Sequence, residues 1–200
     1  MEEHNRYPGR RPSFDSQFAN PAGLLGMLVG HLMAIEHKAL HRAVVDRLSL
    51  QSTDAVLEIG FGPGTAIRHA SRQASSVTGI EISREMVKQA IRRNYRAVRS
   101  GRVELLSGSV AALPFPNGRF NVVFEVNTLH HWGDTVVGLR EVHRVLQPGG
   151  RLLLVLRKGK GPLEPEIARV SRLLERQSFI GITSEEHHFG HGGAFVEARK

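Results

Sequence analysis

Residues 55–64 read AVLEIGFGPG, a short aliphatic run that passes directly into a glycine-rich turn. Aliphatic and β-branched residues bounded by glycines predict a buried central strand, and glycine lets the backbone turn sharply and approach a ligand closely. The next segment, TAIRHA at 65–70, has helical character, so its first amide N–H groups would point into the same crevice. A strand, a glycine turn and a helix in this order predict a nucleotide-binding site.

The spacing of the glycines separates the possible nucleotide ligands. A dinucleotide fingerprint has the pattern GxGxxG, in which the third glycine lets the helix pack closely on the strand. Here the glycines stand at Gly60, Gly62 and Gly64, and Thr65 occupies the place of that third glycine. Together with Glu58 they form the pattern ExGxGxG, which resembles the first motif of class I S-adenosylmethionine-dependent methyltransferases.

An acidic residue after the second apolar run extends this resemblance. Glu81 ends VTGIE at 77–81 and follows the glycine turn by about twenty residues, the spacing of an acidic ribose partner in a βαβ unit. A carboxylate can accept hydrogen bonds from both ribose hydroxyl groups and would repel a phosphorylated ribose. In the family the methionine part of the cofactor lies over the glycine turn, and Ile82 would pack against the adenine.

Three further stretches resemble the family in the expected order. VELLSGSV at 103–110 is similar to the third strand and its adenine loop, with Ser109 where many relatives carry Asp. LPFPNGRFNVVF at 113–124 is similar to the segment that leads into strand four, with Asn121 where Asp is usual. LQPGGRLLLV at 146–155 is similar to the turn before strand five. A serine hydroxyl can still accept a hydrogen bond from the adenine amine, but without charge.

The resemblance implies S-adenosyl-L-methionine as the cofactor and assigns residues to it. Glu125 and Val126 are expected to line its methionine end through backbone groups. The predicted cofactor-binding residues are Glu58, Gly60, Phe61, Gly62, Gly64, Glu81, Ile82, Ser109, Val110, Glu125 and Val126.

The segment NTLHHW at 127–132 follows strand four, at the carboxyl edge where open α/β sheets bind ligands. It resembles a stretch of many small-molecule methyltransferases, including quinone C-methyltransferases, and Trp132 is a candidate for acceptor contact. A histidine titrates near neutral pH and suits a general base where the acceptor must lose a proton. His130 and His131 are therefore the predicted catalytic residues, with packing or helix capping as the alternative.

The implied function is methylation of an oxygen or carbon atom of a small molecule, with aromatic, quinonoid and lipid-like acceptors considered. An NAD-linked oxidoreductase is one alternative, because dinucleotide enzymes share the acidic ribose partner. An RNA or protein methyltransferase is another, because the net charge is +8. A non-catalytic cofactor-binding module is the third. Since the basic residues are scattered on helix faces without interleaved aromatic residues, we expect no nucleic-acid partner.

The alternation of strand and helix signals predicts one α/β domain at 21–200. The resemblance implies a Rossmann-like three-layer sandwich with a seven-stranded, mostly parallel sheet, in the order 3-2-1-4-5-7-6 with strand 7 antiparallel. A tight turn at 148–150 would separate a helix from strand five. Helices are expected at 65–74, 84–98 with Ser83 as N-cap, after Asp134 and at 164–177, and strands at 76–81, 102–107, 120–126, 151–157, 179–183 and 194–198.

The first twenty residues are polar, basic and proline-bearing, which predicts a flexible N-terminal arm at 1–20. An apolar stretch with helical spacing follows at about 21–50. The resemblance makes these helices a lid over the cofactor and part of the acceptor pocket. Simple packing on the sheet is the alternative, because an apolar helix stripe is usually core.

No metal site is predicted, although His187, His188 and His191 lie close in sequence. A zinc site needs more ligands in convergent geometry, so we expect these histidines in a solvent-facing hairpin loop. The chain has no Cys, which excludes disulfides, thiolate metal sites and a cysteine nucleophile. Because the sequence has no apolar run of about 20 residues and no signal-peptide pattern, the cytoplasm is the expected compartment.

Overall fold

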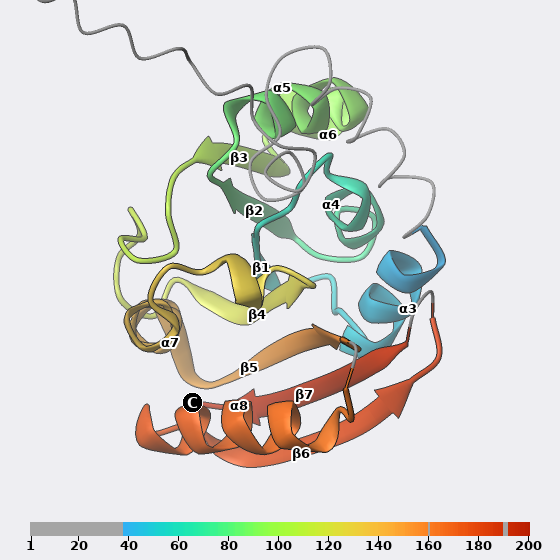
Figure 1. Ribbon diagram of the computed structural model, residues 1–200. Coiled ribbons are helices and arrows are strands. Elements are labelled where there is room, and N and C mark those ends of the chain that lie inside the picture. The colour runs from blue at the N-terminus through green and yellow to red at the C-terminus, as the bar shows by residue number, and fades with distance from the viewer. Residues whose placement is uncertain (1–37, 160, 190–191) are drawn as a thin grey trace, which may run out of the picture.

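The computed structural model describes residues 38–159, 161–189 and 192–200. These residues form a seven-stranded sheet in the order β3-β2-β1-β4-β5-β7-β6, in which only β7 runs antiparallel to its neighbours (Figure 1). The predicted fold class and strand order are confirmed. The strands are β1 (Ala55–Ile59), β2 (Ser76–Glu81), β3 (Val103–Ser107), β4 (Phe120–Val126), β5 (Leu146–Arg157), β6 (Ile180–His187) and β7 (Gly193–Arg199).

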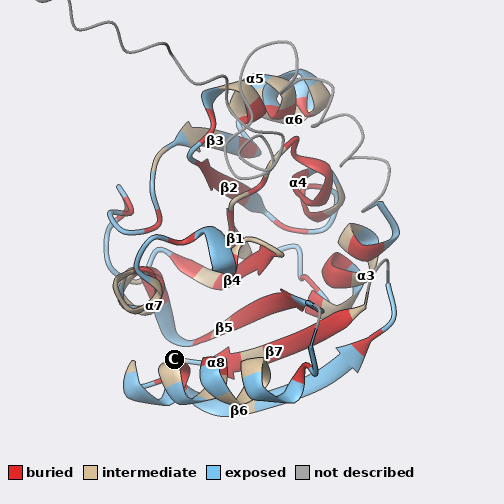
Figure 2. Ribbon diagram, in the orientation of Figure 1, coloured by how far each residue is buried: buried red, intermediate tan, exposed pale blue. Residues whose placement is uncertain are grey.

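Helices cover both faces of this sheet and make it the middle of three layers (Figure 2). On one face, Val44, Ile67 and Ala90 of α3, α4 and α5 pack on sheet residues such as Val56. On the other face, α7 and α8 pack on a second set of strand side chains, which includes Leu57. The helices are α3 (Lys38–Leu48), α4 (Thr65–Ala70), α5 (Arg84–Arg93), α6 (Tyr95–Arg99), α7 (Thr135–Val145) and α8 (Glu164–Arg176), with a single 3₁₀ turn η1 (Leu129–His131).

Two predicted helix caps are present and fix where helices begin. The Ser83 hydroxyl accepts a hydrogen bond from the Met86 N–H at 3.4 Å at the start of α5. The Asp134 carboxylate accepts from the N–H groups of Val136 and Val137 at 2.9 and 3.1 Å at the start of α7. Each cap satisfies backbone donors that have no partner inside the helix.

Two helix predictions differ from the structure. The helix predicted at 65–74 ends at Ala70, and the helix predicted at 84–98 is divided into α5 and α6 at Asn94. The Asn94 side-chain amide donates to the carbonyl oxygens of Gly64 at 3.0 Å and Ala90 at 2.9 Å. An asparagine that bonds local and distant backbone in this way competes with the helical ladder, which explains the break.

The Pro-Gly-Gly stretch at 148–150 lies within β5, although the sequence predicted a turn before that strand. The pairing of β4 with β5 shifts register between Phe120 and Val122, so this stretch is a bulge in the strand. Gly149 has φ +75°, and its N–H donates to the Lys200 carbonyl oxygen at 3.0 Å.

His187 is buried, so the prediction of a solvent-facing loop was wrong for this residue. It ends β6, pairs with Gly193 and is only 6% exposed, with its ring centroid 4.6 Å from that of Phe195. The hairpin pairing extends further than the predicted strand at 179–183, and this places His187 inside the sheet. His188 is exposed as expected, whereas His191 lies outside the described residues. Within the described ranges, no group of three potential ligands could hold a metal ion.

The predicted arm at 1–20 and most of the predicted lid at 21–50 lie outside the described residues. The described part, α3, buries Leu40, Val44, Val45 and Leu48 in the core, and the lid stays a prediction. The helices within the described ranges include none that is both long enough and apolar enough to cross a bilayer.

Candidate functional site

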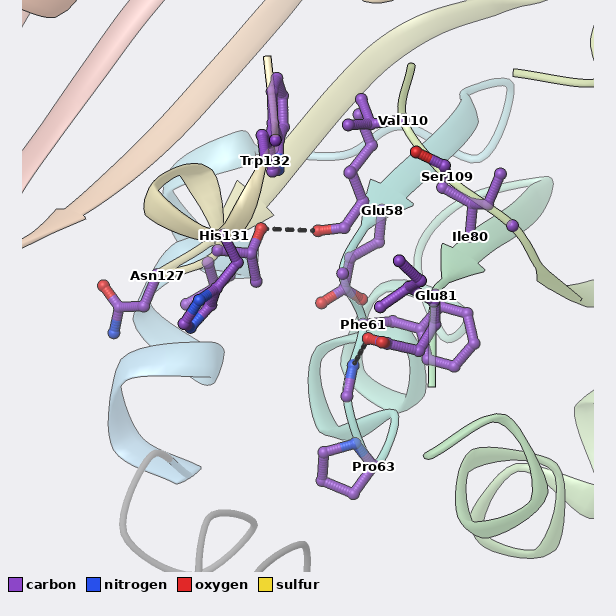
Figure 3. Close-up of a pocket in the computed structure, with 18 of the residues that line it drawn as sticks. Glu58, Phe61, Pro63, Ile80, Glu81, Ser109, Val110, Asn127, His131 and Trp132 are labelled. Atoms are coloured by element: carbon purple, nitrogen blue, oxygen red, sulfur yellow. Dashed lines mark hydrogen bonds between the residues drawn. The ribbon is translucent and has the colours of Figure 1, made fainter. Parts of the chain in front are cut away.

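A pocket opens at the carboxyl ends of β1, β2 and β4 (Figure 3). In the close-up, Asn127, His131 and Trp132 stand on one side and Glu81 and Ser109 on the other. All but two of the residues predicted to bind the cofactor line this pocket. Those that do are Glu58, Gly60, Phe61, Gly62, Glu81, Ile82, Ser109, Val110 and Val126.

Gly60 forms the floor where the glycine turn leaves β1. Its φ is +69°, and its N–H donates to the Ile80 carbonyl oxygen at 2.8 Å. A Cβ at this position would lie 2.6 Å from Cγ2 of Thr128, closer than any real contact. The turn therefore requires glycine here both for its backbone conformation and for the close approach of the β4 exit.

Gly64 does not line the pocket, although the sequence placed it among the cofactor-binding residues. A Cβ on Gly64 would lie 2.7 Å from the Ala90 Cβ and 2.7 Å from the Asn94 side-chain nitrogen. Its absent side chain lets the start of α4 pack directly on α5. The geometry supports a packing role for this glycine, and a cofactor contact stays a prediction.

The Glu81 carboxylate holds the glycine turn against the end of β2. One of its oxygens accepts from the Gly62 N–H at 3.0 Å and the other from the Ser83 N–H at 2.9 Å. A carboxylate has about four acceptor sites, so each oxygen can accept a further hydrogen bond from a ligand. Burial raises the pKa of Glu81, and these backbone donors oppose that rise.

Glu58 is 2% exposed and presents a buried acceptor to the pocket. Its Oε2 atom has no hydrogen-bond partner among the described residues. Burial raises its pKa well above the usual value, and the charges of Glu81 and Glu125 raise it further. A buried carboxylate among two others is costly unless a donor or a cation comes close, so this position suits a cationic ligand group.

Glu125 does not line the pocket, although the sequence expected it at the methionine end. Its carboxylate is fully buried and accepts four hydrogen bonds. The donors are the Thr128 N–H at 2.6 Å, the Thr128 hydroxyl at 3.0 Å, the Leu129 N–H at 3.1 Å and the Val155 N–H at 2.9 Å. Glu125 thus links the turn after β4 to β5. Burial raises its pKa to about 7, although these donors act to lower it. A role at the cofactor stays a prediction.

The two predicted catalytic histidines face different spaces. His131 lines the pocket, whereas His130 lines a second hollow on the other side of η1. Their ring centroids are 3.9 Å apart. Burial lowers the pKa of both, and the neighbouring His131 and Arg157 lower that of His130 further. Both shifts favour the neutral imidazole, which is the form that accepts a proton.

The residues predicted to contact the adenine gather at the pocket mouth. Val110 is buried, whereas Ile82 is 62% exposed and so presents free apolar surface there. The Ser109 hydroxyl accepts from the Ala111 N–H at 3.2 Å. A hydroxyl oxygen has a second acceptor site, so Ser109 retains one for a ligand donor.

The pocket wall also includes residues to which the sequence assigned no role, among them His41, Asn127 and Thr128. His41 comes from α3, within the helices at about 21–50 that the resemblance placed near the pocket, but no local pattern singles out this residue. Asn127 has φ +57° directly after β4. Asn is enriched in this conformation, so an Asn directly after the predicted strand could have indicated a turn at this position.

The polar atoms of the pocket fit S-adenosyl-L-methionine. Besides Glu58 Oε2, Asn127 Oδ1 and Trp132 Nε1 are buried without a partner among the described residues. Buried polar atoms normally form hydrogen bonds, so these three atoms indicate a ligand that has both hydrogen-bond donors and acceptors. The cofactor has such groups in its ammonium, its hydroxyls and its carboxylate, and Glu81 retains acceptor sites for the ribose.

Comparisons with known proteins identify the family of the chain. A family model described as a methyltransferase domain matches residues 57–154. The chain is 31% identical over 142 residues to an uncharacterized methyltransferase, YdaC, of Bacillus subtilis, covering 70% of this chain and 76% of that protein. It is 38% identical over 135 residues to the 27-O-demethylrifamycin SV methyltransferase of Amycolatopsis mediterranei, covering 67% of this chain but 48% of that enzyme. A solved structure of a SAM-dependent methyltransferase from Aquifex aeolicus has the same fold, with a TM-score of 0.64 at 23% identity over 80% of this chain and 88% of its own.

Proposed function

Because the chain belongs to the class I S-adenosylmethionine-dependent methyltransferases, with S-adenosyl-L-methionine as cofactor, we propose that it methylates an oxygen or carbon atom of a small molecule. The observation that carries the proposal is the pocket itself. Glu58 and Glu81 line the same pocket as the exposed His131, and both carboxylates keep acceptor sites that no donor among the described residues uses. The rifamycin methyltransferase, whose name gives a small-molecule acceptor, supports this choice of substrate class.

Several residues of this chain would hold the cofactor. Glu81 would accept hydrogen bonds from the ribose hydroxyls, and Glu58 would lie near the cationic part of the methionine. Ile82 and Val110 would provide apolar contact for the adenine, with Ser109 as its hydrogen-bond partner. Bound cofactor supplies an electrophilic methyl group on a sulfonium, and the remaining work of the protein is to position the acceptor.

Positioning alone can account for much of the catalysis. Holding an acceptor in line and at contact distance can contribute about 7–11 kcal/mol, because translational and rotational freedom is lost before the reaction. Thr128, Leu129 and the His pair lie on a turn that Glu125 fixes through its hydrogen bonds, so this wall is rigid. An acceptor such as a phenol must also lose a proton. We assign the role of proton acceptor to His131, which lines the cofactor pocket, rather than to His130.

Calorimetry with S-adenosylhomocysteine tests the cofactor assignment. Replacing Glu81 by alanine should weaken binding by about 1.5–3 kcal/mol, roughly 10- to 150-fold, because charge-assisted hydrogen bonds are lost. The matched control is Glu85→Ala, which removes a partly buried carboxylate of α5 that pairs with Lys88 and does not line the pocket. Equal affinity of the two variants would contradict the ribose assignment.

A methyl-transfer screen tests the choice of acceptor class. Wild-type protein with labelled S-adenosylmethionine should methylate a member of a phenolic, quinonoid or lipid set. Label transferred only to RNA or protein would contradict a small-molecule acceptor. Cofactor binding without turnover on any acceptor would favour a cofactor-binding module.

A further inference from the structure

A second hollow lies beside the cofactor pocket, on the opposite side of η1. Its walls come from the end of β5, the loop that follows and the start of α8, and they include His130, Arg157, Lys158, Leu163 and Glu166. His130 faces this hollow, while the adjacent His131 faces the cofactor pocket, and their rings are 3.9 Å apart. Adjacent side chains of η1 therefore border the two spaces.

In the part of the chain that the structure describes, the wall of this hollow carries two unpaired positive charges and one carboxylate that is already paired. Arg157 and Lys158 are exposed, and within the described residues neither forms an ion pair. The single carboxylate on the wall, Glu166, is already bound by both Nε and Nη2 of Arg169, at 2.8 and 2.7 Å. The two cations consequently keep their hydrogen-bond donors for a ligand.

The charges on this wall also affect the pKa of His130. Burial lowers the pKa of His130, the charges of His131 and Arg157 lower it further, and Glu166 opposes this shift. A neutral His130 adds no charge to the wall, so the positive potential comes from Arg157 and Lys158. A guanidinium pairs well with planar or tetrahedral oxyanions such as carboxylate and phosphate.

We propose that the methyl acceptor carries an anionic oxyacid group, which Arg157 and Lys158 bind in this hollow. The acceptor extends past the histidine pair, so that its nucleophilic atom enters the cofactor pocket beside His131. This inference rests on the proposed function, since it names the substrate class of the same site. It makes Arg157 a specificity-determining residue for the same reaction.

The test measures binding of three small probes to the protein saturated with S-adenosylhomocysteine. Phenyl phosphate and benzoate carry the two possible anions on one aromatic ring, and benzyl alcohol is the neutral match. Titration calorimetry should give tighter binding for at least one of the two anions than for benzyl alcohol. The anion that binds more tightly identifies phosphate or carboxylate as the acceptor group.

Two variants assign the effect to this hollow. Arg157→Gln should weaken binding of the preferred anion about tenfold, because a charge-assisted contact is lost. Arg176→Gln, which changes an exposed arginine at the far end of α8, should leave the affinity within about twofold, as expected for a distant screened charge. Lys158→Gln provides a second, independent substitution, and thermal unfolding verifies that each variant is folded.

Equal binding of the three probes, or equal losses in the Arg157 and Arg176 variants, would overturn the inference. The affinity for S-adenosylhomocysteine, measured first, separates this failure from that of the proposed function. If the nucleoside does not bind, the cofactor assignment fails. If it binds and the anions show no preference for the intact hollow, only the anionic acceptor is refuted.

Discussion

Replacing Gly60 with alanine should destabilise the fold far more than the same change at Gly62, two residues later in the same turn. Both glycines have positive φ, +69° and +49°, so each substitution incurs a conformational cost of about 1–2 kcal/mol. The Gly60 methyl group would also meet Cγ2 of Thr128 at 2.6 Å, whereas no atom lies within 4 Å of a Cβ on Gly62.

Thr128 has little freedom to move away from that methyl group. Its hydroxyl donates to Glu125 at 3.0 Å and lies 3.2 Å from the Ile59 carbonyl oxygen, and its N–H donates to Glu125 as well. Overpacking of a fixed neighbour costs about 1–3 kcal/mol. The total for Gly60→Ala is then about 2–5 kcal/mol, against about 1–2 kcal/mol for Gly62→Ala.

Urea unfolding at pH 7, followed by circular dichroism, measures both values. Gly62→Ala serves as the matched control, because it shares the left-handed backbone but not the collision. We expect the free energy of unfolding of the Gly60 variant to be lower by about 1–3 kcal/mol than that of the Gly62 variant. Equal values would refute the argument that the close approach of Thr128 selects glycine at position 60.

Three further substitutions test other parts of the site. Burial raises the pKa of Glu125 to about 7, so the folded state favours the protonated side chain. The contribution of Glu125 to the free energy of unfolding is therefore present at low pH and lost as the pH rises through 7. The unfolding free energy of wild type should therefore fall by about 2.5 kcal/mol more than that of Glu125→Gln between pH 5 and 8, and parallel pH profiles would contradict this. Asn121→Asp should cost about 1–3 kcal/mol at pH 8, because the Asn121 amide donates to the Asp54 carboxylate and a second carboxylate would repel it. Urea midpoints of the variant and wild type at pH 8 measure this cost, and equal midpoints would contradict the pairing of Asn121 with Asp54. His131→Ala should lower kcat for a phenolic acceptor about 100-fold or more while the affinity for S-adenosylhomocysteine changes little, and an equal loss in His130→Ala would argue against His131 as the base.

The fold and most of the pocket-lining residues were predictable because the sequence signals for them are local. The glycine turn after residues 55–59, the acidic end of the next strand and the caps Ser83 and Asp134 each act over a few residues. Such signals fix the order of strands and helices. The carboxyl edge of a parallel sheet then brings Glu58 and Glu81 together without any knowledge of side-chain packing.

The features that were missed depend on contacts between distant segments. Asn94 breaks its helix because the Gly64 carbonyl lies within reach, thirty residues earlier in the chain. His41 reaches the pocket only because α3 packs beside α4. The burial of His187 depends on how far the β6–β7 pairing extends.

The departure from the family pattern at Asn121 has a similar origin. Its side-chain oxygen accepts from the Ala55 N–H at 2.7 Å, while its amide donates to the Asp54 carboxylate. An Asp at this position could accept but not donate, so the amide is matched to Asp54. A sequence pattern alone gives no indication of this pairing.

The place of β7 between β5 and β6 sets the order in which the sheet can be completed during synthesis. A ribosome delivers β6 before β7, yet within the described sheet β6 hydrogen-bonds to β7 alone. The nascent β6 therefore has no edge to join until the following strand has emerged. When both are available, the two strands add to β5 as one hairpin, and Arg47 of α3 then ties Glu185 and Glu197 across it. We therefore expect this part of the sheet to form cooperatively, as one hairpin and not strand by strand.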